Sequence, residues 1–147
     1  MLKRLALVVT LLFVLALSAS AVDRKYITDS SLSDLPFSNG VLVGDTLYIG
    51  GHLGLDPKTG KAISDPEQEA KAVLDAIKKT VESAGMTMDD IVSIQVHCPD
   101  LSLYDTFNKV YKTYFKDHYP ARAFLGSGKL LREAHFEVLG IAVKKSK

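Results

Sequence analysis

The segment PARAFLGSGKLLREAHFEVLGIAV, residues 120–143, contains the two stretches that we expect to decide the fold and the site. Pro120–Leu125 and His135–Val143 are short and rich in apolar residues, as strands are, and a loop of glycine, serine and basic residues joins them. The first stretch carries Arg122 and the second carries Glu137, each among apolar neighbours. We therefore predict two neighbouring strands that bring an arginine and a glutamate together.

Arg122 and Glu137 are the candidate catalytic pair. A guanidinium can hold a carboxylate ligand in a bidentate fork. A carboxylate kept partly from water can move a proton. An arginine and a glutamate on neighbouring strands also commonly form a structural ion pair, because paired charges mark function only in some proteins. The sequence leaves both interpretations open.

Residues 1–21 have the pattern of a secretory signal peptide. Lys3 and Arg4 precede the apolar run Leu5–Leu17, and small residues ending at Ala21 supply a cleavage site. The run is short for crossing a bilayer, which takes about 20 residues. We predict cleavage near Ala21 and an exported protein, periplasmic or secreted, that is not held in a membrane. An uncleaved anchor is the alternative.

The division that follows is a signal peptide 1–21, an N-terminal arm 22–34 and one domain 35–147. Cleavage removes two basic residues and no acidic one, which leaves 126 residues with a formal net charge of −1. That length suits a single core. Because no basic stripe remains, nucleic acid is not an expected partner. The lone Cys98 cannot form an intramolecular disulfide and is expected to be buried and inert.

A hairpin opens the domain. Val41–Val43 and Thr46–Ile49 are β-rich runs on either side of Gly44-Asp45, which has turn chemistry. The pair Gly50-Gly51 follows directly, and predicts either a bulge or a close approach of the backbone to a ligand. An edge strand is also expected in the arm, around Lys25–Thr28.

The first helix begins at Asp65 and ends at Gly85. Asp65 is the expected N-cap, Pro66 the first helical residue and Gln68 the third residue of a capping box. Gly85 is typical of the position after a helix. A buried stripe at helical spacing comprises Ala70, Val73, Leu74, Ile77 and Val81. The charged residues between them, Glu69 included, are predicted to form the solvated face.

A strand over Ile91–Cys98 and a second helix over Leu103–His118, with Ser102 as N-cap, complete the pattern. The aromatic stripe of that helix, which includes Tyr111, is interpreted as core. The whole chain therefore predicts an α+β fold: a mixed sheet with two helices on one face. The other face would be open and apolar, which predicts self-association.

No phosphate-binding glycine loop, nucleophile elbow or zinc-ligand spacing occurs, so no metal and no organic cofactor are expected. Several short motifs nevertheless occur in a characteristic order. They are PFSNG at 36–40, VGDTLYIGG at 43–51, LDPKTG at 55–60, AG at 84–85, FNKVY at 107–111, PAR at 120–122 and FEV at 136–138.

From about Leu35 to Val143 the chain resembles the RidA/YjgF family of imine deaminases, also called endoribonuclease L-PSP. The resemblance implies a chorismate-mutase-like fold assembled as a homotrimer, with sites in the clefts between subunits. Such proteins hydrolyse enamine and imine intermediates, such as 2-aminoacrylate, to 2-keto acids and ammonia without metal or cofactor. The ligand implied is a small 2-imino or 2-keto acid.

The same resemblance assigns roles to residues. Arg122 matches the arginine that grips the substrate carboxylate, and Glu137 matches the glutamate that positions or activates water. The residues implied to line the pocket are Phe37, Gly51, Asn108 and Phe124.

This chain departs from the family at Phe37, Gly50, His52 and Ala123, where Tyr, Ser, Gln and Ser or Thr are usual. His52 is expected to replace lost hydrogen bonds, act as a base, or be a simple surface residue. The function predicted is an exported imine deaminase. The alternative is a non-catalytic trimer that binds small carboxylates or acts as a holdase; a ribonuclease is disfavoured by the charge balance.

Overall fold

The computed structural model of the chain describes residues 22–29 and 35–145. The predicted signal peptide and its cleavage site at Ala21 lie outside these residues. The described strands are β1 Arg24–Ile27, β2 Gly40–Val43, β3 Thr46–Leu53, β4 Ile91–Cys98, β5 Ala121–Gly126 and β6 Glu137–Val143. The described α-helices are α2 Pro66–Ser83 and α3 Tyr104–Tyr111. None of the described helices is long and apolar enough to cross a bilayer.

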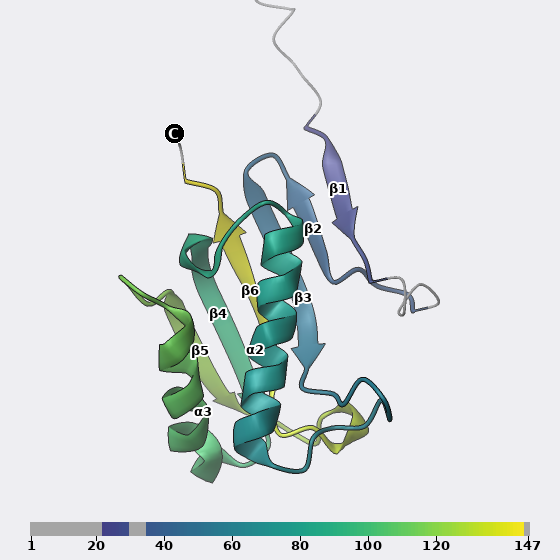
Figure 1. Cartoon of the computed structure of the whole chain (residues 1–147), viewed down its shortest axis with the longest axis vertical. Coiled ribbons are helices and arrows are strands. Elements are labelled where there is room, and N and C mark those ends of the chain that lie inside the picture. The colour runs from purple at the N-terminus through teal and green to yellow at the C-terminus, as the bar shows by residue number, and fades with distance from the viewer. Residues whose placement is uncertain (1–21, 30–34, 146–147) are drawn as a thin grey trace, which may run out of the picture.

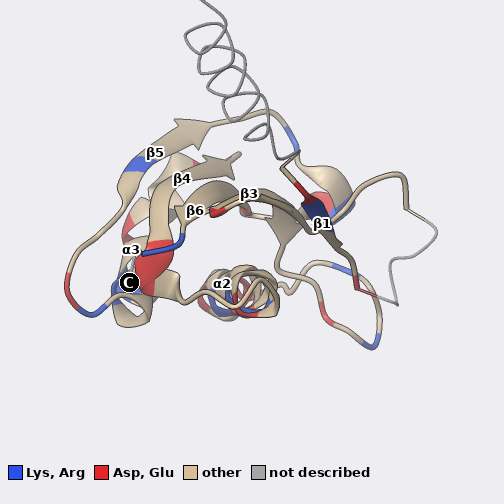
Figure 2. Ribbon diagram, turned by 90° about the horizontal axis from the view of Figure 1, so that it is seen from above, with Lys and Arg blue, Asp and Glu red and all other residues tan. Residues whose placement is uncertain are grey.

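The six strands form one mixed sheet in the order β1-β2-β3-β6-β4-β5 (Figure 1). Every pairing is antiparallel except that of β4 with β5, which is parallel. Figure 2 shows α2 and α3 side by side on one face of the curved sheet. The α+β architecture with both helices on one face is therefore confirmed, as are the opening hairpin and the edge strand in the arm.

The expectation that the last two strands are neighbours is wrong, because β4 lies between β5 and β6. The physical reason is the crossover through α3. A strand–helix–strand connection returns the chain parallel to β4, which places β5 at the edge of the sheet. The loop 127–136 then carries the chain past β4, and β6 pairs with both β3 and β4.

The first helix follows its sequence signals. The Asp65 side chain accepts a hydrogen bond from the backbone N–H of Gln68 at 2.9 Å, and Pro66 starts the helix. Gly85 adopts φ +74° directly after the C-cap, which a residue without a Cβ does at little cost. The predicted apolar stripe is fully buried against the sheet.

The second helix is shorter than predicted and Ser102 is not its N-cap. A 3₁₀ turn at Leu101–Leu103 precedes α3, and the Asp100 carboxylate caps that turn by accepting the N–H of Ser102 at 2.9 Å. After Tyr111 the chain tightens into a second 3₁₀ turn, where the Thr113 hydroxyl donates to the carbonyl of Val110 at 2.7 Å. Such side-chain hydrogen bonds compete with α-helical pairing and end the helix early.

Glu69 is fully buried, so its assignment to the solvated face of α2 is wrong. Its carboxylate accepts the backbone N–H groups of His135 and Phe136 at 2.7 and 2.9 Å. It also accepts a bond from Nδ1 of the His135 ring at 2.6 Å. A buried carboxylate is tolerated when hydrogen bonds satisfy it, as these three do. They attach α2 to the chain immediately before β6, and so fix where Glu137 begins that strand.

Candidate active site

Arg122 lies on the helix-covered side of the sheet. In the parallel β4–β5 pair it is opposite Ile94, and Phe124 is opposite Val96. Ile94 and Val96 are buried beneath the helices, and residues paired across a sheet point to the same face. Arg122 and Phe124 therefore face α3.

Aromatic rings from α3 and β5 surround the Arg122 guanidinium. Its Cζ lies 4.6 Å from the ring centroid of Tyr111, 5.7 Å from that of Tyr104 and 5.8 Å from that of Phe124. Nη2 donates to the Tyr104 hydroxyl at 3.4 Å. Nη1 is buried and has no hydrogen-bond partner among the described residues, and the same is true of the Tyr111 hydroxyl. Two buried polar atoms without partners in contacting side chains identify this cluster as unusual, since such groups are rare.

The electrostatics of the cluster are those of a shielded cation. Burial raises the pKa of Tyr111 to about 12, although the nearby Arg122 charge acts in the opposite direction. Tyr111 is therefore a neutral phenol at neutral pH. Within residues 22–29 and 35–145, Arg122 forms no ion pair with an acidic side chain. Its charge is available for an anionic ligand.

Glu137 lies on the opposite, open side of the sheet. It pairs with Leu53 on β3 and with His97 on β4. Its neighbours Phe136 and Val138 are buried on the helix side, so alternation turns the glutamate away from the helices. The interpretation of Arg122 and Glu137 as a structural ion pair within one chain is therefore wrong, and so is their predicted adjacency.

The Glu137 carboxylate lies against Gly51, in the space that a side chain at position 51 would fill. The register of β3 against β6 shifts between Ile49 and His52, which is the predicted bulge at the paired glycines. A Cβ atom on Gly51 would overlap Oε1 of Glu137, so any larger residue would displace the carboxylate from its present position. The close approach at these glycines is therefore by a side chain of the same protomer.

The other predicted site residues divide between the two sides. Asn108 lies on α3 between Tyr104 and Tyr111, one helical turn from each, on the side of Arg122. Phe37 precedes β2 and is 53% exposed. Their roles in binding stay predictions.

His52 is buried on the helix side, so the surface interpretation of this residue is wrong. One ring nitrogen contacts the carbonyl of Gly50 at 2.7 Å and the other contacts the Thr80 hydroxyl at 2.9 Å. Burial lowers the pKa of His52 against the opposing effect of the Gly50 hydrogen bond. A neutral ring with both nitrogens occupied holds β3 against α2. Cys98 is buried as predicted, and burial raises the pKa of its thiol.

Sequence reasoning missed Tyr104 and placed Tyr111 only in the core. The available signal was the helical spacing of Tyr104, Asn108 and Tyr111, which puts all three on one stripe. That stripe faces Arg122 only because α3 packs over β5, which local sequence does not show.

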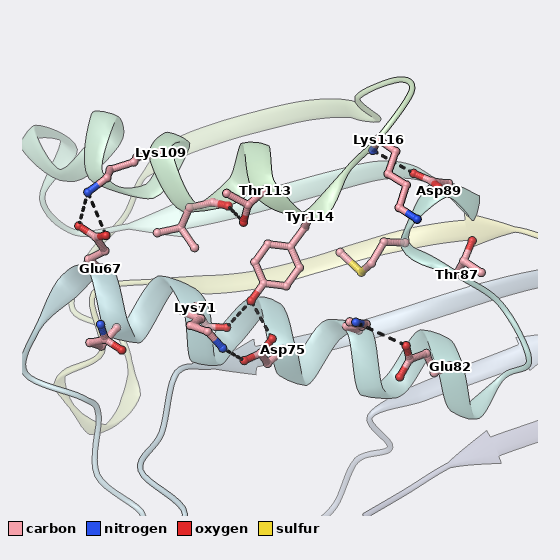
Figure 3. Close-up of a pocket in the computed structure, with 14 residues that line it drawn as sticks. Glu67, Lys71, Asp75, Glu82, Thr87, Asp89, Lys109, Thr113, Tyr114 and Lys116 are labelled. Atoms are coloured by element: carbon pink, nitrogen blue, oxygen red, sulfur yellow. Dashed lines mark hydrogen bonds and ion pairs between the residues drawn. The ribbon is translucent and has the colours of Figure 1, made fainter.

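A groove with a volume of about 600 Å³ lies elsewhere, between α2 and α3 (Figure 3). Its walls carry ion pairs between Lys109 and Glu67 at 2.9 Å and between Lys71 and Asp75 at 2.6 Å. The Tyr114 hydroxyl donates to the same Asp75 at 2.7 Å. Neither Arg122 nor Glu137 lines this groove, whose charges neutralise one another. As for metals, the part of the chain that the structure describes contains no group of three His, Cys, Asp or Glu side chains able to hold an ion.

A mixed sheet with two helices on one face, an arginine in an aromatic cluster and a glutamate over a glycine bulge define a class of small α+β proteins. The family model described as Endoribonuclease L-PSP matches residues 28–144. The chain belongs to this family, which is also called RidA/YjgF.

Relatives and solved structures agree with that assignment. The chain is 34% identical over 110 residues to the human 2-iminobutanoate/2-iminopropanoate deaminase, and the aligned region covers 74% of this chain and 80% of the human protein. It is 33% identical over 113 residues to the Escherichia coli protein of that name, covering 75% and 88% of the two chains. The crystal structure of the E. coli YjgF gene product superposes with a TM-score of 0.77 at 30% identity, covering 82% and 99%. That of E. coli TdcF with bound serine gives 0.75 at 28% identity, covering 82% and 100%.

Proposed function

We propose that this protein hydrolyses small 2-imino acids, and their enamine tautomers such as 2-aminoacrylate, to 2-keto acids and ammonia. Relatives about one-third identical that carry the name 2-iminobutanoate/2-iminopropanoate deaminase support the reaction class. The single observation that carries the proposal is that Arg122 is held at the edge strand without an acidic partner among the described residues. A half-buried cation left uncompensated by its own fold is suited to an acidic ligand.

The reaction requires binding of a carboxylate and movement of protons. Arg122 binds the substrate carboxylate. Glu137 accepts a proton from water as the water oxygen bonds to the imine carbon, and then gives that proton to the imine nitrogen, which yields a carbinolamine. Glu137 next takes the proton of the carbinolamine hydroxyl and passes it to the amine, so that the C–N bond breaks, ammonia leaves and the hydroxyl oxygen becomes the keto oxygen. One imino acid and one water thus give one keto acid and one ammonia, with no redox step.

We further propose that Arg122 and Glu137 of one site come from two copies of the chain, assembled as a homotrimer. In one protomer the two side chains point to opposite faces of the sheet, with β4 between their strands. The open face that carries Glu137 also carries a cross-strand row of Tyr26, Val41, Tyr48 and Ile141. Tyr26 and Tyr48 are 61% and 52% exposed. An apolar face of this kind favours association, and a head-to-tail interface of a ring can bring it to the neighbour's β5 edge.

Mixing two inactive variants tests the site. Arg122→Ala and Glu137→Gln should each lose imine hydrolysis. When the two are unfolded and refolded together in equal amounts, about a quarter of random head-to-tail interfaces regain both groups. Recovery of about a quarter of wild-type ammonia release supports a shared site, and no recovery from a correctly assembled mixture rejects it.

Export is a separate part of the proposal and rests on the pattern of residues 1–21. Expression of the full chain in a bacterium, followed by fractionation and N-terminal sequencing, should give a mature protein that begins at Val22. A full-length protein retained in the cytoplasm would reject this part and leave the deaminase proposal unaffected.

A non-catalytic carboxylate binder is the second candidate, and the separation of the two groups favours it specifically, because Arg122 can bind an acid without help from Glu137. Imines generated in situ distinguish the candidates. Wild-type protein that binds 2-ketobutanoate but does not accelerate ammonia release is a binder.

A further inference from the structure

We propose that Tyr104 and Tyr111 are positioning residues for Arg122, which together fix the plane and rotation of its guanidinium so that a ligand carboxylate meets a preoriented fork. The inference rests on the proposed function, since it takes Arg122 as the carboxylate-binding group. Neither tyrosine needs to touch the substrate carbon. Their effect is on the orientation of the cation.

Tyr111 supplies a flat support for the guanidinium. Its ring centroid is 4.6 Å from Cζ of Arg122, the shortest of the three ring contacts. A guanidinium over an aromatic face is attracted by the ring and stacks on it. The Tyr111 ring is itself only 3% exposed and is packed against Phe107 and Phe115, with centroids 5.8 and 4.8 Å away. The Tyr111 ring is therefore held by its neighbours, and we expect the guanidinium plane to follow it.

Tyr104 sets the rotation within that plane. Its hydroxyl accepts from Nη2 at 3.4 Å, which is long for a hydrogen bond. The Tyr104 ring meets Phe124 edge-on at 5.0 Å and 84°, which fixes the position of the hydroxyl. Tyr104 is 44% exposed, so a carboxylate oxygen from solvent can replace this weak contact with a shorter, charged one. The hydroxyl thus marks where a ligand oxygen is to bind.

The buried Nη1 decides which edge of the guanidinium is offered. Nη1 is buried and has no acceptor within residues 22–29 and 35–145, so the end formed by Nη1 and Nη2 is closed to a ligand in this arrangement. The bidentate edge that remains is Nη2 with Nε. Arg122 therefore presents one defined edge, and a carboxylate that binds there has a defined orientation relative to β5.

Three variants and one matched control test the positioning role through KM and kcat for 2-iminobutanoate generated in situ. Tyr111→Leu should raise KM about tenfold with kcat within about twofold, because the cation–ring attraction acts on ground state and transition state alike. Tyr111→Phe keeps the ring and should keep the wild-type KM.

Tyr104→Phe should raise KM about twofold to threefold. The control Tyr114→Leu removes a ring of the α2–α3 groove whose hydroxyl bonds to Asp75, and should lower the melting temperature while leaving KM unchanged.

A second measurement needs no turnover. In NMR spectra of the intact protein, the Arg122 Nε–H resonance should show ring-current displacement and slow rotation about Nε–Cζ in wild type and in Tyr111→Phe. Both features should be weaker in Tyr111→Leu, which keeps the more distant Tyr104 and Phe124 rings. Wild-type KM and wild-type Nε–H behaviour in folded Tyr111→Leu would overturn the inference, as would a Tyr111→Phe variant as impaired as Tyr111→Leu.

Failure of the proposed function has a different signature. If Arg122→Ala binds 2-ketobutanoate as tightly as wild type, Arg122 is not the carboxylate-binding group and the proposed function is rejected, whatever the tyrosine variants do. If Arg122→Ala loses binding while Tyr111→Leu behaves as wild type, the proposed function stands and only the positioning role is rejected.

Discussion

Arg122 and Glu137 lie on opposite sides of the sheet, in contrasting surroundings. On the helix side Arg122 lies among Tyr104, Tyr111 and Phe124, and one of its nitrogens is buried without a partner in the part of the chain that the structure describes. On the open side Glu137 lies over Gly51, whose missing side chain leaves space for the carboxylate. The side chains around Arg122 hold it in position by contact. The Glu137 carboxylate instead occupies space that is open because Gly51 has no side chain.

This difference separates binding from proton transfer. A cation that rings hold in one plane has a fixed direction, which suits recognition of a planar carboxylate. A carboxylate on an open face can exchange protons with water and with a ligand. If the two sides have these separate tasks, changes on one side should alter affinity and changes on the other should alter turnover.

The largest effect is expected from Glu137→Gln. The amide keeps the shape of the side chain over Gly51 but is not a base, so kcat should fall on the order of 10²–10⁴-fold. The affinity for 2-ketobutanoate, measured by titration calorimetry, should stay the same. Equal losses of affinity and turnover would show that the two sides do not have separate tasks.

Arg122→Lys should come next, with kcat/KM lower by roughly 10- to 100-fold through a higher KM. An ammonium group keeps the charge but cannot form the planar fork, and hydrogen bonds to charged groups contribute about 1.5–3 kcal/mol each. Initial rates of ammonia release give the number. Arg132→Lys is the matched control, because Arg132 bonds to the backbone carbonyl of Gly60 and lies outside the cluster. Turnover of 2-aminoacrylate by Arg122→Lys at the wild-type rate removes the arginine from the mechanism.

Gly51→Ala tests the space beside Glu137. The added methyl overlaps the end of the flexible Glu137 side chain, which must move aside, so we expect about a tenfold loss of kcat but a change in stability of at most about 0.5 kcal/mol. Gly128→Ala is the control, since a Cβ there has no atom within 4 Å. Rates of ammonia release and urea unfolding, measured for both variants, give the changes in kcat and in stability. Unchanged kcat in folded Gly51→Ala would mean that the position of the carboxylate is not critical.

The smallest effect concerns His52, on the helix side of the same strand as Gly51. Burial lowers its pKa in the folded protein, so between that lowered value and the unfolded pKa of about 6.5 the unfolded chain binds more protons. The contribution of His52 to stability is therefore complete above about pH 6.5 and is lost as the pH falls below it, by at most about 1.4 kcal/mol per pH unit.

Urea unfolding at several pH values measures this slope. His52→Gln should remove its contribution, whereas replacement of the exposed His118 by glutamine should not alter it. The same slope in wild type and His52→Gln would contradict the assignment of a buried neutral imidazole.

Local signals were enough for most of the elements. Asp65, Pro66 and Gly85 mark the ends of α2 because capping and left-handed backbone are properties of a few adjacent residues. The hairpin before Gly50-Gly51 follows from turn chemistry in the same way. The predicted end of α3 was wrong because the Thr113 hydroxyl donates to a backbone carbonyl of the helix. Local sequence does not show whether a threonine side chain makes this bond.

Glu69 shows a limit of pattern reading. Its charge predicts exposure although it stands four residues before Val73, at the margin of the buried stripe, and the N–H groups of His135 and Phe136 come from far along the chain to satisfy it. The periodicity of α2 does not reveal these distant donors. The burial of a charge depends on which distant donors reach it.

The sequence by itself determined that Arg122 and Glu137 are the charged residues of interest, because each interrupts an apolar strand and matches a family position. Only the tertiary structure decided that they do not meet within one chain. The crossover through α3 inserts β4 between their strands, and strand alternation turns them to opposite faces. Which strands become neighbours depends on long-range pairing, and that pairing sets what each side chain can contact.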